Sequence, residues 1–246
     1  MNILFTNDDG YTALGINTLF EVFAHKHNCY MIAPHCQRSA CSNAINIESP
    51  IKLHMHDKRH FSLEGYPADC ANISFYGNVI PKVDLVISGI NHGPNMGDDI
   101  YYSGTLAGAR TSYVHGLSAI AVSYNSFTDY PYMEDAANFM LNLIEDFNFD
   151  RQVFLNVNYP HLSKEKIRGI KYTTLGRRKY VDSYKMDNDE GNVKTFSLSG
   201  IVDNIHKDGS DVTEVFNGYI SITPLHLDTT DYTYLKILQN NTDKKL

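Results

Sequence analysis

Two aspartates, Asp8 and Asp9, stand side by side directly after a short apolar segment at the start of the chain. Adjacent carboxylates repel each other, and such a pair is stable when a cation lies between them or when one carboxylate keeps its proton. A bound divalent cation is the simpler explanation. The alternative without chemistry is that Asp8-Asp9-Gly10 forms an ordinary turn, which is what this tripeptide most often does.

Two more oxygen-bearing side chains occupy corresponding places after later apolar segments. Ser39 follows the segment 29–33, and Asn91 follows the segment 84–88. Because ligands bind beyond the carboxyl ends of the strands in an open parallel sheet, we expect both residues to lie near the two aspartates. A set of oxygen ligands suits Mg²⁺, Mn²⁺ or Ca²⁺ rather than zinc. This convergence favours a metal site over a simple turn.

A glycine-rich stretch between Ser88 and Arg110 supplies a second candidate element. Ser103, Gly104 and Thr105 open a predicted helix, and the free N–H groups and positive dipole end of a helix bind anions. We therefore expect a phosphate at this point. For this stretch alone, an ordinary capped helix after a glycine-rich loop is an equally good interpretation. The absence of a Walker A pattern leaves an NTPase little support.

Position separates the roles of Asn91 and Asn95, since an amide can supply either an acceptor or a donor. Asn91 directly follows a predicted strand and is assigned to the metal, whereas Asn95 lies nearer the helix start and is assigned to the phosphate. His92 can donate to a phosphate or to a leaving group, and the alternative is a polar loop histidine without such a role. The basic cluster 177–179 is typical of a solvated face, with contact to substrate as the alternative.

The elements that must position these groups alternate between short apolar strands and helical patterns. Such alternation is the signature of a parallel sheet covered by helices on both faces, an α/β fold. Strands are predicted over 2–6, 29–33, 51–55, 84–88, 117–123 and 153–157. Helices are predicted after Gly15 and over 67–75, 104–115 and 133–147.

The last third of the chain lacks this helical periodicity. Glu190-Gly191-Asn192 is predicted to be the tip of a long β-hairpin, and 218–223 is predicted to be a final strand. Because an isolated hairpin is marginally stable, we expect it to pack on a partner subunit or on the sheet. The chain is thus divided into a Rossmann-like catalytic core, 1–160, and a segment of hairpin, final core strand and oligomerisation elements, 161–246.

Composition narrows the class of protein further. The 246 residues, 43% of them hydrophobic, suffice for a core without disulfides. A net charge of −7 disfavours a stable nucleic-acid partner, since the nucleic-acid backbone is bound through Lys and Arg. The four scattered cysteines fit a reducing compartment. With no leader-like N-terminus and no membrane-length apolar run, we expect a cytoplasmic protein without a membrane partner.

Four motifs in the first half of the chain carry a family resemblance. In order they are Asn7-Asp8-Asp9-Gly10-Tyr11, Ala33-Pro34 followed by Ser39, Gly65-x-Pro67-Ala68-Asp69-Cys70, and Ser88-Gly89-Ile90-Asn91-x-Gly93-x-Asn95-x-Gly97 leading to Tyr102-Ser103-Gly104-Thr105. Together they resemble the SurE nucleotidase family. Two positions depart from its pattern: Ala40 stands where a glycine is expected, and Tyr66 where a threonine is expected.

The resemblance implies a fold, an activity and a set of site residues. The fold is a Rossmann-like three-layer domain with a mostly parallel sheet, joined by a C-terminal hairpin and tail that are exchanged in a homodimer or homotetramer. The activity is hydrolysis of nucleoside 5′- and 3′-monophosphates with one divalent cation per subunit, Mg²⁺ or Mn²⁺, and with exopolyphosphatase activity as a side reaction. The metal ligands it implies are Asp8, Asp9, Ser39 and Asn91, and the phosphate contacts are Asn95, Ser103, Gly104 and Thr105.

The expected mechanism is attack on phosphorus by a metal-activated water, with Asp8 or Asp9 as the proton acceptor. One alternative enzyme is a phosphatase that forms an aspartyl-phosphate, but it needs a D-x-D arrangement, whereas these carboxylates are adjacent. A nucleotide-sensing module without turnover is the alternative outside enzymes. A phosphate-release assay distinguishes the sensor from the enzyme.

Overall fold

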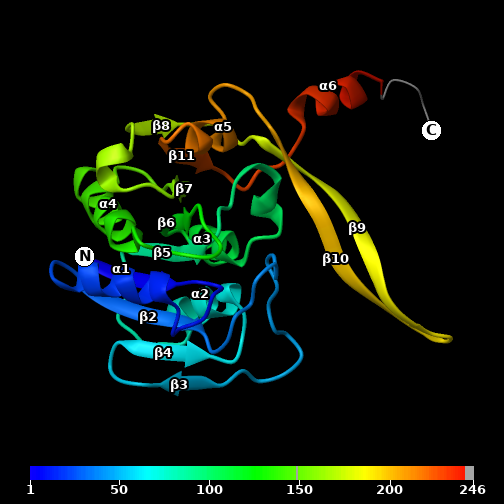
Figure 1. Cartoon of the computed structure of the whole chain (residues 1–246). Coiled ribbons are helices and arrows are strands. Elements are labelled where there is room, and N and C mark those ends of the chain that lie inside the picture. Colours follow the sequence, from blue (N-terminus) through cyan, green and yellow to red (C-terminus); the bar gives the residue numbers. More distant parts are fainter. Residues whose placement is uncertain (148, 242–246) are drawn as a thin grey trace.

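A mixed sheet forms the centre of the protein (Figure 1). The computed structural model describes residues 1–147 and 149–241. Position 148 of the expected core 1–160 and residues 242–246 of the expected segment 161–246 therefore lie outside the described residues. Within the described ranges the sheet has nine strands: β1 (Asn2–Thr6), β2 (Asn28–Pro34), β3 (Leu53–Met55), β4 (His60–Leu63), β5 (Leu85–His92), β6 (Ser118–Tyr124), β7 (Phe154–Tyr159), β8 (Ile170–Tyr172) and β11 (Ile220–Leu225).

The strand order is β3-β4-β2-β1-β5-β6-β7-β11-β8. From β4 through β7 all neighbours are parallel, whereas β3 with β4 and β11 with β7 are antiparallel. The chain passes from β1 to β2 on one side and later to β5 on the other side of β1. The boundary between β1 and β5 is therefore the topological switch point, where ligands bind in sheets of this type.

Helices cover both faces of the sheet, which confirms the predicted α/β class. The helices α1 (Leu14–Ala24) and α4 (Met133–Asp146) pack together on one face, and α2 (Pro67–Tyr76) and α3 (Gly104–Val114) pack together on the other. In α1, the spacing of Ile16, Leu19 and Phe23 forms one apolar stripe, and all three side chains are fully buried. Phe23 meets Phe5 of β1 edge to face, with ring centroids 5.3 Å apart.

The predicted hairpin is present and projects away from the sheet and its helices (Figure 1). It consists of β9 (Arg177–Glu190) and β10 (Val193–Ile205), which pair antiparallel as a separate two-stranded sheet. Its tip contains Gly191 at φ +72°, a conformation that favours glycine. Many apolar side chains on the hairpin are exposed, among them Tyr184, Phe196, Leu198 and Ile201.

Several elements differ from the sequence-based prediction. Strand β5 was expected to end at Ser88 but continues to His92, with a register shift that lets Asn91 and His92 pair with β6. Strand β4 was not predicted, and neither were the helices α5 (Asp211–Phe216) and α6 (Tyr232–Asn241). Two short 3₁₀ helices, η1 (Gly97–Tyr101) and η2 (Lys164–Lys166), complete the elements. None of the helices in the described residues is both long and apolar enough to cross a membrane.

Candidate active site

The two aspartates lie at the switch point, in a turn that follows β1. Asn7 shapes this turn, because its amide nitrogen donates to the Gly10 carbonyl at 2.9 Å and its amide oxygen accepts from the Gly10 N–H at 3.2 Å. Gly10 adopts φ +101°, which a residue with a side chain rarely does. The backbone of the turn is joined to the neighbouring loop, since Arg38 N–H donates to the Asp8 carbonyl at 2.6 Å. The sequence motif around Gly10 therefore forms a turn and also presents two carboxylates.

Asp8 is almost fully buried, with 4% of its surface exposed. Burial raises the pKa of Asp8 from 3.8 to about 7, and the neighbouring charge of Asp9 adds to this rise. The Thr105 hydroxyl opposes it by donating to Asp8 Oδ1 at 2.5 Å. Asp8 thus sits in an environment where an additional positive charge would be strongly stabilising.

Asp9 is the second buried carboxylate, and burial raises its pKa as well. The His92 N–H donates to Asp9 Oδ2 at 3.0 Å and lowers that pKa, and the His92 imidazole acts in the same direction. In the described part of the chain, the only ion-pair partner of either carboxylate is His92, with Nδ1 3.9 Å from Asp9 Oδ1. Two adjacent carboxylates without a Lys or Arg partner fit a divalent cation.

Ser39 and Asn91 supply the remaining expected oxygen ligands. The Asn91 amide nitrogen donates to the Gly93 carbonyl at 2.8 Å, which leaves its amide oxygen as the group for a ligand. Ser39 Oγ accepts from Gln37 Nε2 at 2.9 Å and is otherwise exposed. No three His, Cys, Asp or Glu side chains among the described residues form a metal-binding group, so a cation here would depend on the hydroxyl and the amide as well as on the carboxylates.

The predicted phosphate site lies at the N-terminus of α3, directly against Asp8. Ser103 caps the helix by accepting from the Leu106 N–H at 3.1 Å. Gly104 allows the close approach, because a Cβ atom there would lie 2.7 Å from Asp8 Cβ. In this structure the Gly104 N–H and the Thr105 hydroxyl both act on Asp8. The helix start therefore stabilises a carboxylate as well as offering donors to an anion.

A cavity of about 990 Å³ opens above these residues. Six of the nine residues assigned to the site from the sequence line it, namely Asp8, Ser39, Asn91, His92, Asn95 and Ser103. The other three, Asp9, Gly104 and Thr105, adjoin it through their bonds to His92 and Asp8. Its lining also includes aromatic and basic side chains, among them Tyr101, Tyr102, Phe127, Arg177 and Lys179.

The basic cluster at the start of β9 is bound to the loop that precedes α3 rather than solvated throughout. Arg178 is buried and pairs with Asp99, while the Arg177 Nε donates to Asp98 at 3.0 Å. Asp211 of α5 reinforces this junction, because its carboxylate accepts from the N–H groups of Gly97 at 2.9 Å and Gly176 at 2.7 Å. Asp211 and the aspartates of η1 were not singled out from the sequence, since their partners lie between 35 and 114 residues away.

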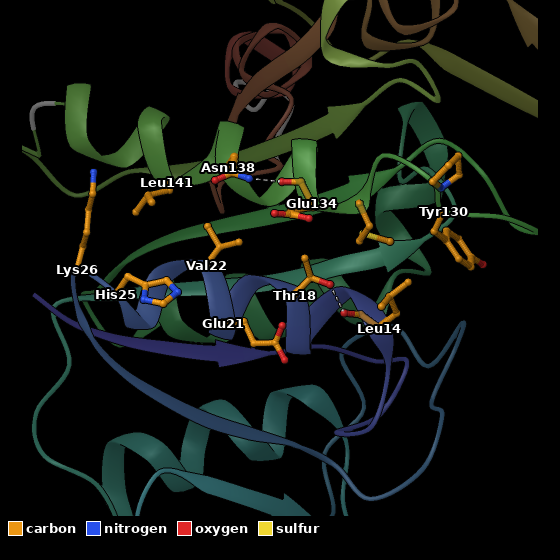
Figure 2. A pocket seen from close by; sticks show the side chains of 12 residues that line it. Leu14, Thr18, Glu21, Val22, His25, Lys26, Tyr130, Glu134, Asn138 and Leu141 are labelled. Atoms are coloured by element: carbon orange, nitrogen blue, oxygen red, sulfur yellow. Dashed lines mark hydrogen bonds between the residues drawn. The ribbon is translucent and has the colours of Figure 1, made fainter.

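A second cavity, of about 590 Å³, lies between α1 and α4 and is shown in Figure 2. Its lining contains Thr18, Glu21, His25 and Glu134 but none of the nine site residues. One residue joins the two regions, since Tyr130 lines this second cavity and stacks on His92 with ring centroids 4.2 Å apart. The strand-end cavity remains the candidate active site because Asp8 and five more of the nine site residues line it.

The two departures from the family pattern have structural counterparts. Ala40 has φ +55°, in the left-handed region that favours the glycine expected at that position. Tyr66 precedes α2, and its N–H donates to Asp69 at 3.0 Å. Its ring lies under the Arg38 guanidinium, 5.2 Å from the ring centroid, and Asp69 also binds the Asn46 N–H. The Pro-Ala-Asp motif thus holds α2 and the loop after Ser39 in place.

Fold and site together define an α/β protein with a Rossmann-like sheet and a buried acidic centre at the switch point. The family model described as "Survival protein SurE" matches residues 3–182. A protein named 5′-nucleotidase SurE from Leptospira interrogans is 39% identical over 250 residues, which cover 100% of both chains. Another protein of that name, from Clostridium botulinum (strain Alaska E43 / Type E3), is 39% identical over 247 residues, covering 96% of this chain and 97% of the relative.

The solved structures agree with the sequence comparison. The crystal structure of the SurE protein from Aquifex aeolicus superposes with a TM-score of 0.84 at 32% sequence identity, covering 99% of this chain and 100% of the other. The chain belongs to the SurE family.

Proposed function

We propose that this protein is a metal-dependent phosphomonoesterase that hydrolyses nucleoside 5′- and 3′-monophosphates to nucleoside and phosphate. Full-length similarity to proteins named 5′-nucleotidase SurE supports a nucleotidase. The observation that carries the proposal is the pair of desolvated carboxylates, Asp8 and Asp9, of which Asp8 lies against the N-terminus of α3 and lines the cavity.

The proposed cofactor is one Mg²⁺ or Mn²⁺ per subunit, held by Asp8, Asp9, Ser39 and Asn91. These residues fit a hard cation because all four offer oxygen and because the two carboxylates have no Lys or Arg partner within the described ranges. When bound, such an ion lowers the pKa of a water nucleophile and offsets the charge that develops on the transferring phosphoryl group.

The chain's own residues bind and orient the phosphate in this proposal. Asn95 and Ser103 line the cavity, and together with the first N–H groups of α3 they supply donors for the non-bridging oxygens. Fixed donors of this kind stabilise developing negative charge without reorganisation. Either Asp8 or Asp9 accepts the proton of the attacking water, while the other carboxylate remains a ligand of the cation.

His92 is the residue proposed to donate to the leaving group. Its ring lines the cavity, is stacked on Tyr130, and its Nε2 is buried without a hydrogen-bond partner among the described residues. A buried nitrogen of this kind can donate to the departing nucleoside oxygen. The aromatic wall containing Tyr101, Tyr102 and Phe127 suits a nucleobase, since stacking accepts any base.

The remaining parts of the proposal concern assembly, side activity and compartment. The exposed apolar side chains of β9 and β10, such as Leu198 and Ile201, support a homodimer or homotetramer in which the hairpin segment, within 161–246, contacts a partner subunit. The same site would release terminal phosphate from polyphosphate as a side activity. All four cysteines are free thiols, which supports the cytoplasm as the compartment.

The test is phosphate release from a panel of nucleoside 5′- and 3′-monophosphates and polyphosphate, with Mg²⁺, Mn²⁺ or excess chelator. We expect hydrolysis with either metal and its loss on chelation, restored by adding the cation back. Full activity in a metal-stripped sample would contradict the metal-dependent mechanism. Binding of monophosphates without any turnover would show a sensor instead of an enzyme.

A further inference from the structure

Three polar side chains on β6 and β7 are buried where the sheet could have been apolar. Asn156 and Asn158 alternate along β7 with Leu155, Val157 and Tyr159, which belong to the main apolar core on the other face. Both asparagines are fully buried, as is Ser123 of β6. Burying an amide in a strand lowers stability unless its hydrogen bonds are made, so these residues need a reason to be there.

Their hydrogen bonds converge on one residue of the loop after β5, Asn95. Asn158 Oδ1 accepts from the Asn95 N–H at 2.9 Å, and Asn158 Nδ2 donates to the Asn95 carbonyl at 3.0 Å. Asn156 Nδ2 donates to the same carbonyl at 2.8 Å. Both backbone polar groups of Asn95 are therefore held by side chains more than 60 residues away along the chain.

The side chain of Asn95 is held as firmly as its backbone. Its amide nitrogen donates to Ser123 Oγ at 2.8 Å and lies 3.4 Å from Thr105 Oγ1, whose hydroxyl donates to Asp8. The N–H of this longer contact is the one that can donate to a phosphate oxygen in the cavity instead. A continuous chain of hydrogen bonds thus runs from β7 through Asn95 and Thr105 to Asp8.

Asn156 shows that this arrangement is not favoured by packing alone. Its amide oxygen is buried and has no hydrogen-bond partner in the described residues, an arrangement that is unfavourable by about 1–3 kcal/mol for a typical polar group. Turning the amide over would satisfy nothing, because its oxygen would then face the Asn95 carbonyl. A leucine of similar volume would avoid the unpaired group, so the amide is explained by the bond that it makes to Asn95.

We propose that Asn158, assisted by Asn156, is a positioning residue for the reaction: it fixes the backbone of Asn95 so that the amide of Asn95 points toward the phosphate. The inference rests on the proposed function, in which Asn95 binds the substrate phosphate. Asn158 touches neither substrate nor metal in this assignment and acts through Asn95 alone.

The test compares Asn158→Leu, Asn95→Ala and the double variant in hydrolysis of a nucleoside monophosphate with Mn²⁺. Asn158→Leu is expected to lower kcat/KM by about 10- to 100-fold, the loss expected for a charge-assisted hydrogen bond. Mn²⁺ affinity, measured by calorimetry, should change by less than about twofold, because the four ligands are untouched. The double variant should be no worse than Asn95→Ala, since a residue that acts only through another adds no loss once that other is removed.

Thr223→Val is the matched control for loss of a buried polar group. Thr223 lies on β11 in register with Asn156 of β7, is 2% exposed, and bonds to Thr173 at 2.7 Å, with no hydrogen bond to Asn95. The control should lower the Tm while leaving kcat/KM within about twofold of the wild type, because it removes a buried hydroxyl beside the same strand but none of the bonds that hold Asn95.

Three results would overturn the inference. They are losses that multiply in the double variant, unchanged kcat/KM in Asn158→Leu, and a crystal structure of Asn158→Leu in which Asn95 has not moved. The crystal structure of the variant tests the positioning role independently of the kinetics. If the wild-type protein hydrolyses no monophosphate, the proposed function fails, whereas a displaced Asn95 in the variant still supports the positioning role.

Discussion

Replacing Asp8 by asparagine is expected to stabilise the metal-free protein while abolishing its activity. The pKa of Asp8 is raised to about 7 in the folded protein, from 3.8. A carboxyl with a raised folded pKa binds its proton more tightly in the native state, so its ionisation destabilises the fold progressively as pH rises from about 4 to about 7. The amide in Asp8→Asn stays neutral and can still accept the hydrogen bond from Thr105.

The magnitude follows from the two pKa values. They differ by about three pH units, each worth about 1.4 kcal/mol, so the ionised carboxylate lowers the stability of the metal-free fold by about 4 kcal/mol at neutral pH. Burying the neutral amide also lowers the stability of the variant, but that contribution does not depend on pH. The stability of Asp8→Asn relative to wild type should therefore increase by about 2–3 kcal/mol between pH 5 and pH 8.

The assay is urea unfolding of both proteins in excess chelator at pH 5 and pH 8. Asp146→Asn, which removes an exposed carboxylate at the end of α4, controls for the change in net charge. Adding Mn²⁺ should then narrow the difference at pH 8, because a ligand at 100 times its Kd stabilises the wild type by about 2.7 kcal/mol while the variant binds it weakly. A stability difference that is the same at both pH values, or that shrinks at pH 8, would refute the reasoning.

Further predictions concern the ligands, the loop and the hairpin. Asn91→Ala should weaken Mn²⁺ binding in calorimetry, with activity partly recovered at high metal, whereas Asn95→Ala should leave metal affinity near normal and lower kcat/KM by about 10- to 100-fold; the reverse pattern would exchange the two assignments. Ala40→Gly should raise stability in urea unfolding by about 0.5 kcal/mol, because the strain of φ +55° is relieved and partly offset by a more flexible unfolded chain; a loss of stability would show that the loop is not strained. Ile201→Lys on the hairpin should lower the mass measured by light scattering, since it places a charge on the exposed apolar strand; a wild type that is already monomeric and fully active would contradict the oligomer. No phosphate should remain covalently attached to the protein after acid quenching, and recovery of an aspartyl-phosphate would favour the alternative mechanism.

Local periodicity was sufficient to predict the strands and helices that carry the carboxylates. Strand β1 spans the predicted 2–6, and α1 buries Ile16, Leu19 and Phe23, as their helical spacing indicates. Helix α3 starts at Gly104 as predicted. Convergence of Asp8 and Asn91 followed from the rule that parallel strands present their carboxyl ends at one edge, and it needed no knowledge of side-chain packing.

The parts that the sequence did not reveal depend on partners far away in the chain. Strand β5 continues through Gly89 to His92 because β6 offers Ser123 and Tyr124 for pairing, and a glycine signals only that the strand has an irregularity. The roles of Asn156 and Asn158 were missed for a similar reason. Two asparagines alternating in a strand normally mark a solvent face, and only the position of Asn95 shows that they are buried.

The hydrogen bonds of the Asp211 carboxylate affect the order in which parts of the protein can fold during synthesis. It binds the N–H groups of Gly97 and Gly176, although Gly97 precedes it by 114 residues. During synthesis the turn with Asp8 and the strands beside it can form early, because β1, β2 and β5 and all their pairing partners lie before residue 125. The Gly97 N–H in the loop that follows Asn95 has no native acceptor until α5 leaves the ribosome. A nascent chain can therefore bring Asp8 and Asp9 together well before this loop has all its hydrogen bonds, and the complete site needs the last third of the sequence.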